Sequence, residues 1–392
     1  MKHARNSTAR IATAALCGAI AIAAALLPVG CATGNGVDAV ALDPSYYTDK
    51  YDYDNADTFL DRGINLGNFL EAPPTTTYPT GEGNWNGGVI AAQDDFTRMA
   101  ALGFKNVRIP VKWSAHASPT APYTIKPEFM ARVKEVVGYA RAANLIVVLN
   151  VHHYSEMFSD PATALPGHRE RLKAIWDQLC DAFPETDPLY AKDVLVFELL
   201  NEPNATVGAT EWNAIVAELA KVIWTDNGAT QANRKIMVGT AKWGGFFGLA
   251  DLSLPPECTP ANTIVTVHCY DPFRFTHQGA EWAKDSSAWI GTTWTGTQTE
   301  LDELTGIFAL ADSWKANGYE VYLGEFGVYP VYAKPSNVKA WTGFIAREAE
   351  RRGMSWAYWE YCAGLGAYDH AAAQWKPNIV DALIPAVDRP AQ

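Results

Sequence analysis

The chain contains 392 residues, 48% of them hydrophobic and 19% charged, which allows a sizeable core and excludes a disordered or collagen-like chain. By length it holds one large domain or two ordinary ones. Its formal net charge is −12, whereas a protein that binds duplex nucleic acid normally carries a basic face, so we expect no nucleic-acid partner. The 14 Trp residues are many for this length, and indole rings either pack in cores or stack on flat apolar faces such as those of sugars.

The N-terminus predicts an export signal that is not part of the fold. Lys2, Arg5 and Arg10 come without an acidic residue, and an apolar run follows from residue 11 to residue 29. A basic segment followed by an apolar one is typical of an export signal. No later stretch reaches the ~20 apolar residues that a membrane span needs. We therefore expect an exported protein, either secreted, periplasmic or lipid-anchored at the cell surface.

Two processing routes fit this signal. Residues 27–31, Leu-Pro-Val-Gly-Cys, resemble a bacterial lipobox, in which Cys31 would carry lipid and anchor the chain in the membrane. Pro28 departs from the Leu that is usual at its position. Cleavage after residues 39–41, Ala-Val-Ala, is the alternative. The predicted organisation is a signal peptide over residues 1–31 (a lipoprotein signal in the first case), a flexible polar tether over 32–60 and a single catalytic domain over 61–392.

Four cysteines lie beyond the signal, and no Cys-x-x-Cys pair occurs, which disfavours a zinc ribbon. They are Cys180, Cys258, Cys269 and Cys362. Export permits disulfides, and four cysteines allow three pairings that the sequence cannot rank. Free buried thiols are the alternative.

Short runs rich in β-branched residues alternate with helical patterns along the rest of the chain. The candidate strands are Arg62–Gly67, Asn106–Val111, Leu145–Val151, Val194–Leu200, Lys235–Thr240, Thr263–Tyr270, Val321–Phe326 and Ser355–Tyr361. The candidate helices are Ile90–Leu102, Pro127–Ala143, Gly167–Phe183, Thr210–Thr225, Thr297–Asn317 and Ser336–Arg352. The Gly-rich segment Trp243–Leu252, between the fifth and sixth strands, gives the weakest helical signal.

Eight strands that alternate with helices predict an α/β fold, a (β/α)8 TIM barrel. A doubly wound open sheet is the alternative, but no Gly-x-Gly-x-x-Gly turn follows any candidate strand. In such a barrel the reactive groups lie where strands end and the next loops begin. The candidate strands end near reactive residue types, which are Asn68, Arg108, His152, Asn201, Glu202, His268, Tyr270, Glu325 and Trp359.

Two glutamates at strand ends are the candidate catalytic groups. Glu202 follows the fourth strand in Leu-Asn-Glu-Pro, where the proline cannot continue a ladder and leaves the carboxyl group at the rim. Glu325 lies at the end of the seventh strand in Gly-Glu-Phe-Gly, where the flanking glycines allow close backbone approach. For each, the alternative is a solvated Glu in a turn. Two carboxylates that face each other across a cleft can cleave a glycosidic bond, one as proton donor and the other as nucleophile or base.

Arg108 ends the second strand and must pair with a carboxylate, because a buried unpaired charge is costly. Pairing with Glu325 would keep that residue ionised, as a nucleophile requires. We favour this pairing over a structural ion pair with Glu198. Asn201, beside Glu202, can donate a hydrogen bond to a ligand hydroxyl.

The histidines form no metal-binding pattern in the sequence. His152 and His153 are adjacent on a strand, so we expect their side chains on opposite faces, where they cannot bind one ion together. His268 and Tyr270 share a face and can position a carboxylate or hold sugar hydroxyls. We expect no metal and no other cofactor. A serine hydrolase would need a Gly-x-Ser-x-Gly elbow, which does not occur in the sequence.

Two long loops are predicted to wall an open groove, with aromatic residues that suit pyranose faces. The loop over residues 271–296 carries Phe273, Phe275, His277, Trp282, Trp289 and Trp294. The loop over residues 68–88 adds Glu71, Tyr78 and Trp85.

A series of motifs in chain order connects these observations. They are Gly63–Asn68 with Leu70–Pro73, Asn106–Pro110, Val151–Tyr154, Leu200–Pro203, Val267–Phe273, Phe275–Ala280, Gly324–Gly327 and Ala357–Tyr361. The set resembles glycoside hydrolase family five, the cellulase family of clan A. Asn-Glu-Pro alone is moderately specific, whereas the ordered set, which runs from Arg62 nearly to the C-terminus, is highly specific.

This resemblance implies a (β/α)8 barrel and a retaining, endo-acting β-glycanase with Glu202 as acid/base and Glu325 as nucleophile. The family's other active-site positions correspond to Arg108, His152, Asn201, His268, Tyr270 and Trp359. Positions that bind sugar in the nearer relatives correspond to Asn68, Glu71, His153, His277, Trp282 and Glu360.

The expected function is an exported, monomeric endo-β-1,4-glucanase, or cellulase, that acts on β-linked polysaccharides or oligosaccharides. A β-mannanase or a mixed-linkage glucanase with the same groups is the alternative among enzymes. A non-catalytic carbohydrate-binding barrel at the cell surface is the alternative from another class, but binding alone needs no paired carboxylates. A metal-dependent deacetylase or amidohydrolase would need clustered ligands that the sequence does not show.

Overall fold

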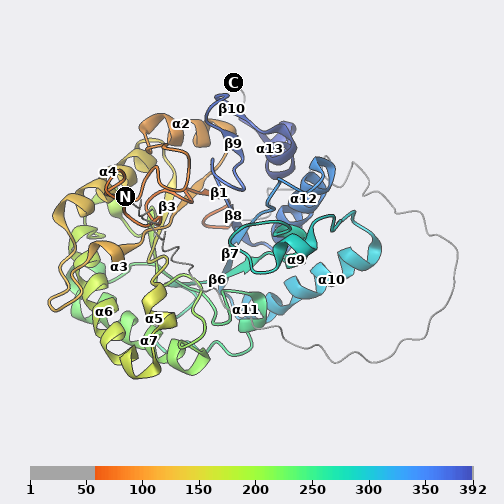
Figure 1. Ribbon diagram of the computed structural model, residues 1–392. Helices are drawn as coiled ribbons and strands as arrows, with labels where there is room; N and C mark the ends of the chain where they lie inside the picture. Colours follow the sequence, from red (N-terminus) through yellow and green to blue (C-terminus); the bar gives the residue numbers. More distant parts are fainter. Residues whose placement is uncertain (1–57, 391–392) are drawn as a thin grey trace, which may run out of the picture.

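The computed structural model describes residues 58–390, in which eight parallel strands close into a barrel in chain order (Figure 1). The strands are β1 (Arg62–Asn65), β2 (Asn106–Ile109), β3 (Ile146–Asn150), β4 (Leu195–Glu198), β5 (Ile236–Val238), β6 (Thr263–Cys269), β7 (Glu320–Phe326) and β8 (Ser355–Tyr358). The predicted (β/α)8 barrel is confirmed. The predicted signal with Cys31, and the predicted tether up to residue 57, lie outside the described residues.

Most strands end earlier than the sequence predicts. β4 stops at Glu198, although the apolar run continues to Leu200. The backbone beyond β4 is still hydrogen-bonded to the segment that follows β3, because the N–H of Asn201 donates to the carbonyl of Val151 at 2.9 Å. Residues just past the strand ends are therefore fixed in place without belonging to a regular ladder.

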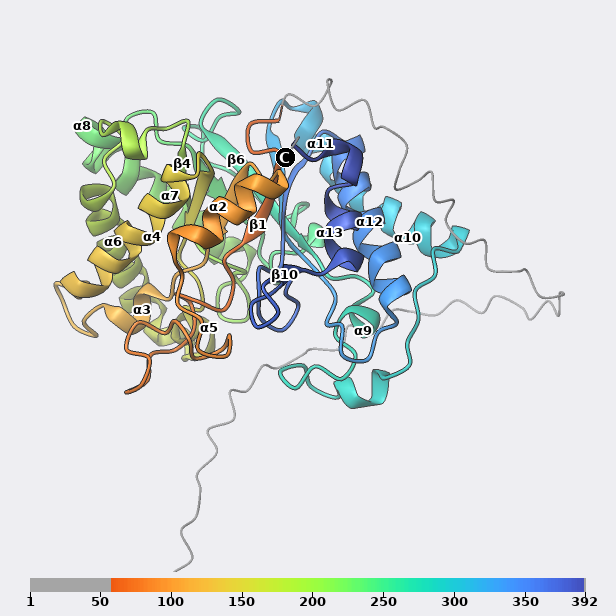
Figure 2. The same cartoon turned by 90° about the horizontal axis from the view of Figure 1, so that it is seen from above.

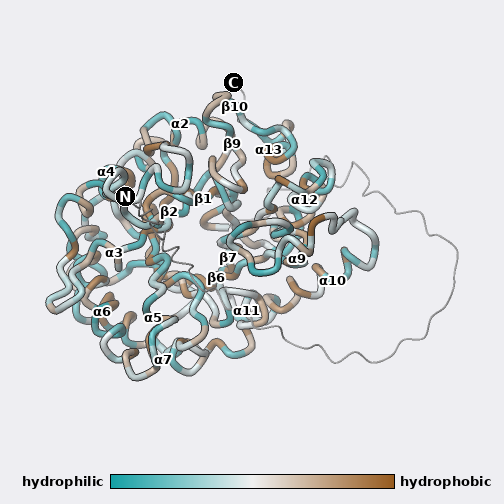
Figure 3. Tube along the Cα trace, viewed as in Figure 1, coloured by the Kyte–Doolittle hydropathy of each residue, from teal (hydrophilic) through white to brown (hydrophobic). Residues whose placement is uncertain are grey.

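Helices form a ring around the barrel, and hydrophilic and hydrophobic stretches alternate along them (Figures 1 and 3). The longer helices are α2 (Gln93–Leu102), α4 (Pro127–Ala142), α6 (Leu165–Ala182), α7 (Ala209–Lys221), α10 (Gln298–Phe308) and α12 (Pro335–Arg351). Shorter ones are α8 (Gly228–Gln231), α11 (Asp312–Ala316) and α13 (Pro377–Leu383). Helices α4, α12 and α13 begin at a proline, whose missing N–H has no intrahelical partner at that position anyway.

The helices differ from the prediction in two places, and the weakest helical signal contains no α-helix. The segment Thr297–Asn317 is not one helix, because α10 ends at Phe308 and a 3-10 turn separates it from α11. Helix α13, which packs against α12, was not predicted. The Gly-rich segment after β5 is described throughout and contains one 3-10 turn, Phe246–Gly248, and no α-helix.

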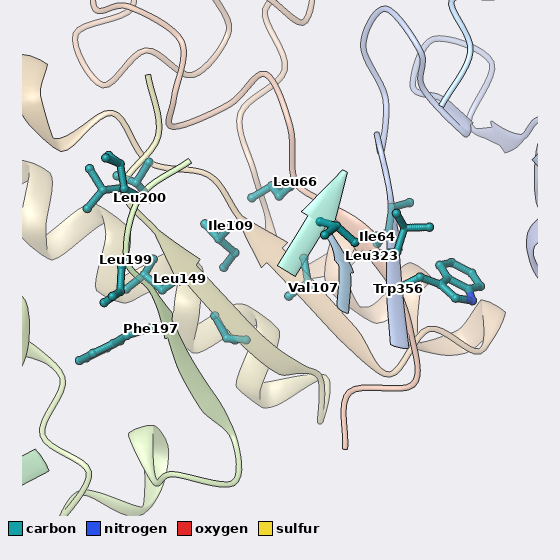
Figure 4. Close-up of a cluster of buried hydrophobic side chains, with 14 of the residues drawn as sticks. Ile64, Leu66, Val107, Ile109, Leu149, Phe197, Leu199, Leu200, Leu323 and Trp356 are labelled. Atoms are coloured by element: carbon teal, nitrogen blue, oxygen red, sulfur yellow. The ribbon is translucent and has the colours of Figure 1, made fainter. Parts of the chain in front are cut away.

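Apolar side chains fill both sides of the strands. One large buried cluster includes Ile64, Val107 and Phe197, and Figure 4 shows part of it. A smaller cluster of strand residues on the alternate positions, with Val148 and Leu60, fills the N-terminal end of the barrel. Leu60 falls within the predicted tether, but its side chain is fully buried, so the fold begins earlier than predicted.

The mouth of the barrel carries short helices on the loops that follow the strands. Helices α3 (Trp113–His116), α5 (Ser155–Ser159) and α9 (Phe273–Thr276) follow β2, β3 and β6 and lie at one end of the barrel (Figure 2). Because all eight strands are parallel, their C-terminal ends open at this end. Within residues 58–390, no helix has both the length and the apolar character needed to cross a membrane.

All four cysteines of the domain lie in the described part of the chain and are free thiols, three of them buried. None of the three disulfide pairings that the sequence allowed is formed there.

Candidate active site

The candidate catalytic side chains meet at the mouth of the barrel, where six strands contribute them. They are Arg108 in β2, His152 after β3, Asn201 and Glu202 after β4, His268 in β6 with Tyr270 just after it, Glu325 in β7 and Trp359 after β8.

Arg108 is fully buried and uses all five of its N–H groups. Nε and Nη2 donate to the two carboxylate oxygens of Glu198 at 2.6 and 2.8 Å, and Nη2 also donates to Oδ1 of Asn201 at 2.7 Å. Nη1 donates to Oδ1 of Asn65 at 2.9 Å and to Oε1 of Glu325 at 2.7 Å. The predicted pairing with Glu325 is confirmed, and the alternative pairing with Glu198 is present as well.

Glu325 receives a donor on each carboxylate oxygen, and its side chain is only 6% exposed. Nη1 of Arg108 binds Oε1, and Oη of Tyr270 donates to Oε2 at 2.9 Å. Burial, followed by the nearby charge of Glu325, raises the pKa of Tyr270 well above its usual value, so this hydroxyl keeps its proton. Two fixed donors stabilise an ionised carboxylate, which is the form that a nucleophile needs.

Glu202 has the opposite environment. Its backbone lies in the left-handed region, with φ +47°, and its Oε1 lies 2.7 Å from Nδ1 of His268. Burial raises the pKa of Glu202, and the charge of Glu325 raises it further against the lowering effect of His268. Burial lowers the pKa of His268, but the charge of Glu325 and the hydrogen bond to Glu202 reverse this and raise it. A carboxyl group with a raised pKa suits a proton donor.

The two carboxylates are close together. One ligating atom from each of Glu202, His268 and Glu325 lies within 4.8 Å of the others. A separation of about 5–5.5 Å fits a carboxylate pair in retaining glycosidases, whereas inverting ones need about 6.5–9.5 Å. Among residues 58–390 these three side chains are also the group that could surround a metal ion. However, the Glu325 oxygens already bind Arg108 and Tyr270, so an acid/base and nucleophile pair fits the arrangement better.

The predicted geometry of His152 and His153 is wrong. β3 ends at Asn150, so the alternation of a strand no longer applies, and His153 has φ +48°. The two rings lie 4.4 Å apart at 88° instead of on opposite faces. Burial lowers the pKa of both, that of His153 to about 3. Both rings are therefore neutral near pH 7 and can hydrogen-bond an uncharged ligand.

Trp359 and Asn68 follow β8 and β1 at the mouth. The half-buried indole of Trp359 stacks on His152, with centroids 5.6 Å apart at 12°. On another side a Cβ at Gly67 would lie 3.0 Å from the indole, so the absence of a side chain there admits the ring. Asn68 follows directly, half-buried and with φ +68°.

Two residues at predicted sugar-binding positions, Glu71 and Glu360, are fully buried. The carboxylate of Glu71 accepts backbone N–H groups of Asn68 and Phe69, the latter at 3.0 Å. The carboxylate of Glu360 accepts N–H groups within residues 362–365 at 2.8–3.1 Å. Burial raises the pKa of Glu71 to about 8 and that of Glu360 to about 7. Both side chains shape loops at the mouth.

The loop after β6 supplies exposed and buried aromatic residues. Trp282 is 52% exposed and Phe273 is 45% exposed. His277 is buried between them, stacked on Phe273 at 4.0 Å and 6.4 Å from Trp282. Phe275 and Trp294, which were predicted to help wall the groove, are fully buried and belong to the core.

Sequence reasoning missed two residues that hold the carboxylates. Asn65 links Arg108 to β7, because its Nδ2 donates to the carbonyl of Gly324 at 2.9 Å. Gly244 has φ +68°, and a Cβ there would lie 3.3 Å from Cγ of Glu202. The Gly-Gly pair at 244 and 245 was a signal for a tight approach, but the sequence does not show what it approaches.

Comparison with known proteins places this site in a family. Residues 70–364 match the sequence model described as Cellulase (glycosyl hydrolase family 5). Endoglucanase H of Acetivibrio thermocellus is 33% identical over 299 residues, which cover 76% of this chain and 29% of that protein. The cellulase/esterase CelE of the same organism is 30% identical, with 39% of it covered. The chain thus spans well under half of these two curated relatives. Endoglucanase B of Clostridium cellulovorans is 27% identical, with 82% of this chain and 73% of that protein covered.

This chain covers nearly the whole length of the solved structures that it matches. The endoglucanase Cel5A of Thermotoga maritima is 40% identical, with a TM-score of 0.75 and coverage of 85% of this chain and 100% of that one. A structure of the same enzyme in complex with mannotriose gives a TM-score of 0.74, with 83% and 98% covered.

Proposed function

The chain belongs to the cellulase family, glycosyl hydrolase family 5, and on this premise we propose that it is a retaining endo-β-1,4-glucanase. The observation that carries the proposal is the pair of carboxylates, Glu202 and Glu325, with oxygens within 4.8 Å in different environments. The endoglucanase names of its relatives support the choice of β-glucans as substrates.

In the first step, Glu325 attacks the anomeric carbon while Glu202 donates its proton to the leaving oxygen. The glycosidic bond breaks and an ester bond to Glu325 forms. Arg108 and Tyr270 hold the attacking carboxylate through both of its oxygens.

In the second step, water attacks the same carbon, Glu202 accepts the proton of that water, and the ester bond to Glu325 breaks. The ester carries no charge, so the repulsion that raised the pKa of Glu202 disappears in the intermediate. The same residue can therefore act first as acid and then as base.

The sugar chain would lie against the aromatic residues at the rim. Trp282, Phe273 and Trp85 are each about half exposed and offer flat apolar faces. The neutral rings of His152 and His153 would bind sugar hydroxyls beside the reacting bond.

Hydrolysis of β-mannans is a second candidate activity of the same site. The structure of Thermotoga maritima Cel5A with mannotriose, at 40% identity, supports testing it.

The experiment follows the viscosity of carboxymethylcellulose and the appearance of reducing ends in the same reaction. We expect viscosity to fall much earlier than reducing ends accumulate, because an endo-acting enzyme cuts internal bonds. A panel of mixed-linkage glucan, xyloglucan, xylan and mannan with product sizing then ranks the substrates. Release of single sugars alone would contradict endo action. Binding without hydrolysis on every substrate would favour the carbohydrate-binding barrel.

We further propose that residues 1–31 direct export, that residues 32–57 act as a tether and that the enzyme is a monomer. The basic and apolar segments of the N-terminus support export. Cell fractionation of the full chain and of Cys31→Ala tests the anchor, because lipidation at Cys31 predicts that only the variant leaves the membrane fraction. Light scattering tests the monomer.

A further inference from the structure

The imidazole of His268 lies between two glycines, which belong to the segments on either side of β6. Gly244 follows β5 on one side, and Gly324 lies in β7 on the other. A Cβ at Gly244 would lie 3.2 Å from Nδ1 of the ring, and a Cβ at Gly324 would lie 3.1 Å from Nε2. Both distances are shorter than ordinary contacts, so a side chain at either glycine would crowd the ring; one at Gly324 would also lie 2.8 Å from Oγ1 of Thr266.

Gly324 is the extra residue of a β-bulge. Val267 pairs with Leu323 and His268 pairs with Glu325, so Gly324 stands opposite no residue of β6. A bulge of this kind changes the direction of neighbouring side chains and is common next to active sites. Here the bulge lies beside the ring of His268, because a Cβ at Gly324 would lie 3.1 Å from Nε2.

Gly244 lies against both Glu202 and His268, which are called the proton-donor pair below. Its carbonyl accepts the backbone N–H of His268 at 2.8 Å, and its own N–H donates to the carbonyl of Thr240 at 3.2 Å. A Cβ at this residue would lie 3.3 Å from Cγ of Glu202 as well as 3.2 Å from Nδ1 of His268. These two side chains are joined by the 2.7 Å hydrogen bond between Oε1 and Nδ1.

We propose that Gly244 is a positioning residue that, with Gly324 behind the ring, holds His268 in hydrogen-bond contact with Glu202 and thereby sets the protonation of the acid/base. This inference rests on the role proposed for Glu202. The other ionisable groups that face the pair are Glu325, Arg108, Tyr270 and His152. None of these four is among the atoms nearest to a Cβ at Gly244, so a substitution there acts on the pair itself.

The direction of the effect follows from the hydrogen bond. His268 lowers the pKa of Glu202, and Glu202 raises the pKa of His268. In Gly244→Ala the new methyl group pushes the two side chains apart. We expect the NMR titration of the His268 ring to move to lower pH and the alkaline limb of kcat/KM to move to higher pH.

The leaving group gives a second readout. For a cellooligosaccharide, which needs protonation of its leaving oxygen, we expect kcat/KM of Gly244→Ala to fall about tenfold, a part of the usual contribution of general acid catalysis. For a dinitrophenyl cellobioside, whose leaving group needs no acid, we expect kcat/KM to change much less. A role confined to stability would lower both alike.

Gly318→Ala is the matched control. Gly318 also has a left-handed backbone, with φ +86°, but its nearest neighbour, Pro260, would lie 3.7 Å from the new methyl group. It should lose stability without either shift. If Gly244→Ala does not fold, Gly244→Asn replaces it, because Asn tolerates this backbone region and still carries a Cβ.

A folded Gly244 variant with an unchanged His268 titration and unchanged leaving-group dependence would overturn the inference, and so would equal shifts in Gly318→Ala. If the wild-type enzyme hydrolyses none of the β-glycans, the proposed function fails, whereas the His268 titration still tests independently whether Gly244 holds His268 against Glu202.

Discussion

Arg108 and Glu325 form a buried ion pair at the mouth of the barrel, with Nη1 2.7 Å from Oε1. A buried ion pair stabilises a fold only when the remaining hydrogen-bonding groups of both partners are satisfied. Here each N–H of the guanidinium has an acceptor, and Glu198 takes two of them. The pair is therefore one part of a network whose geometry depends on the planar fork of arginine.

Arg108→Lys should damage both activity and stability. Lysine offers its donors from one nitrogen and cannot span Glu198 and Glu325 together. We expect kcat/KM on β-glucan to fall about 100-fold or more, as for loss of a fixed donor to a reacting group, with a lower Tm. Arg132→Lys, which weakens a bidentate pair with Glu82, is the control that should lower Tm and leave kcat/KM unchanged. Wild-type kcat/KM in Arg108→Lys would contradict the assignment.

The roles of the two carboxylates can be separated by azide rescue with an activated β-aryl cellobioside. Glu202→Ala should form the glycosyl-enzyme and then stall, and azide should release a β-glycosyl azide after two inversions. Glu325→Gly forms no such intermediate, so azide should give the α-azide after one inversion. Proton NMR of the products checks this. Exchanged anomers would mean that the roles are reversed, and inversion by the wild-type enzyme would exclude a retaining mechanism.

The alkaline limb of activity should report Glu202, which must be protonated to act as acid. Burial raises its pKa, and the hydrogen bond from His268 lowers it. His268→Ala removes the lowering contribution, so the alkaline limb of kcat/KM should move to higher pH while the maximum rate falls. His168→Ala, whose ring contacts Tyr154 and Asp160 instead, should leave the limb in place. A shift to lower pH in His268→Ala would show that His268 raises the pKa of Glu202 instead of lowering it.

The buried carboxyl group of Glu360 should make the thermal stability of the fold depend on pH. Burial raises its pKa from 4.5 to about 7, against the lowering effect of backbone hydrogen bonds. A carboxyl group whose folded pKa exceeds its unfolded value stabilises the fold fully below pH 4.5 and loses that contribution as pH rises through 7. The Tm of the wild type minus that of Glu360→Gln should therefore decrease between pH 4.5 and 7 in thermal melts. A difference that grows with pH would show that the backbone hydrogen bonds outweigh burial.

Treatment with EDTA should leave hydrolysis unchanged, because the proposed chemistry is assigned to Glu202 and Glu325. Their oxygens bind Arg108, Tyr270 and His268. Activity assays before and after chelation and dialysis check this. Activity that disappears with EDTA and returns with a divalent metal would show that the cluster of Glu202, His268 and Glu325 binds an ion after all.

The sequence predicts the barrel and its reactive strand ends because both depend on local pattern. Apolar runs marked all eight strands, and Arg108, Glu202 and Glu325 follow from their places at strand ends and in family motifs. The break after Phe308 and the helix α13 escaped prediction, because the first lies within a continuous helical pattern and the second is a single short helix that packs on α12.

The sequence does not show where the residues of the loops lie relative to the active site. The adjacent rings of His152 and His153 depend on where β3 ends, which alternation alone does not reveal. The burial of Glu71 and Glu360 arises because each carboxylate binds the backbone of its own loop. The approach of Gly244 to Glu202 joins segments that follow different strands, so no local pattern encodes it.

Leu60 closes the barrel at the end away from the mouth, beneath the layer that holds Val148 and Val196. Anything joined to the chain ahead of this residue is therefore attached on the far side from the mouth of the barrel. A fusion partner or a solid support linked there would leave the mouth of the barrel facing the solution, where a polysaccharide can reach Glu202 and Glu325 without meeting the linkage. The same attachment at a loop of the mouth would compete with the substrate for that space.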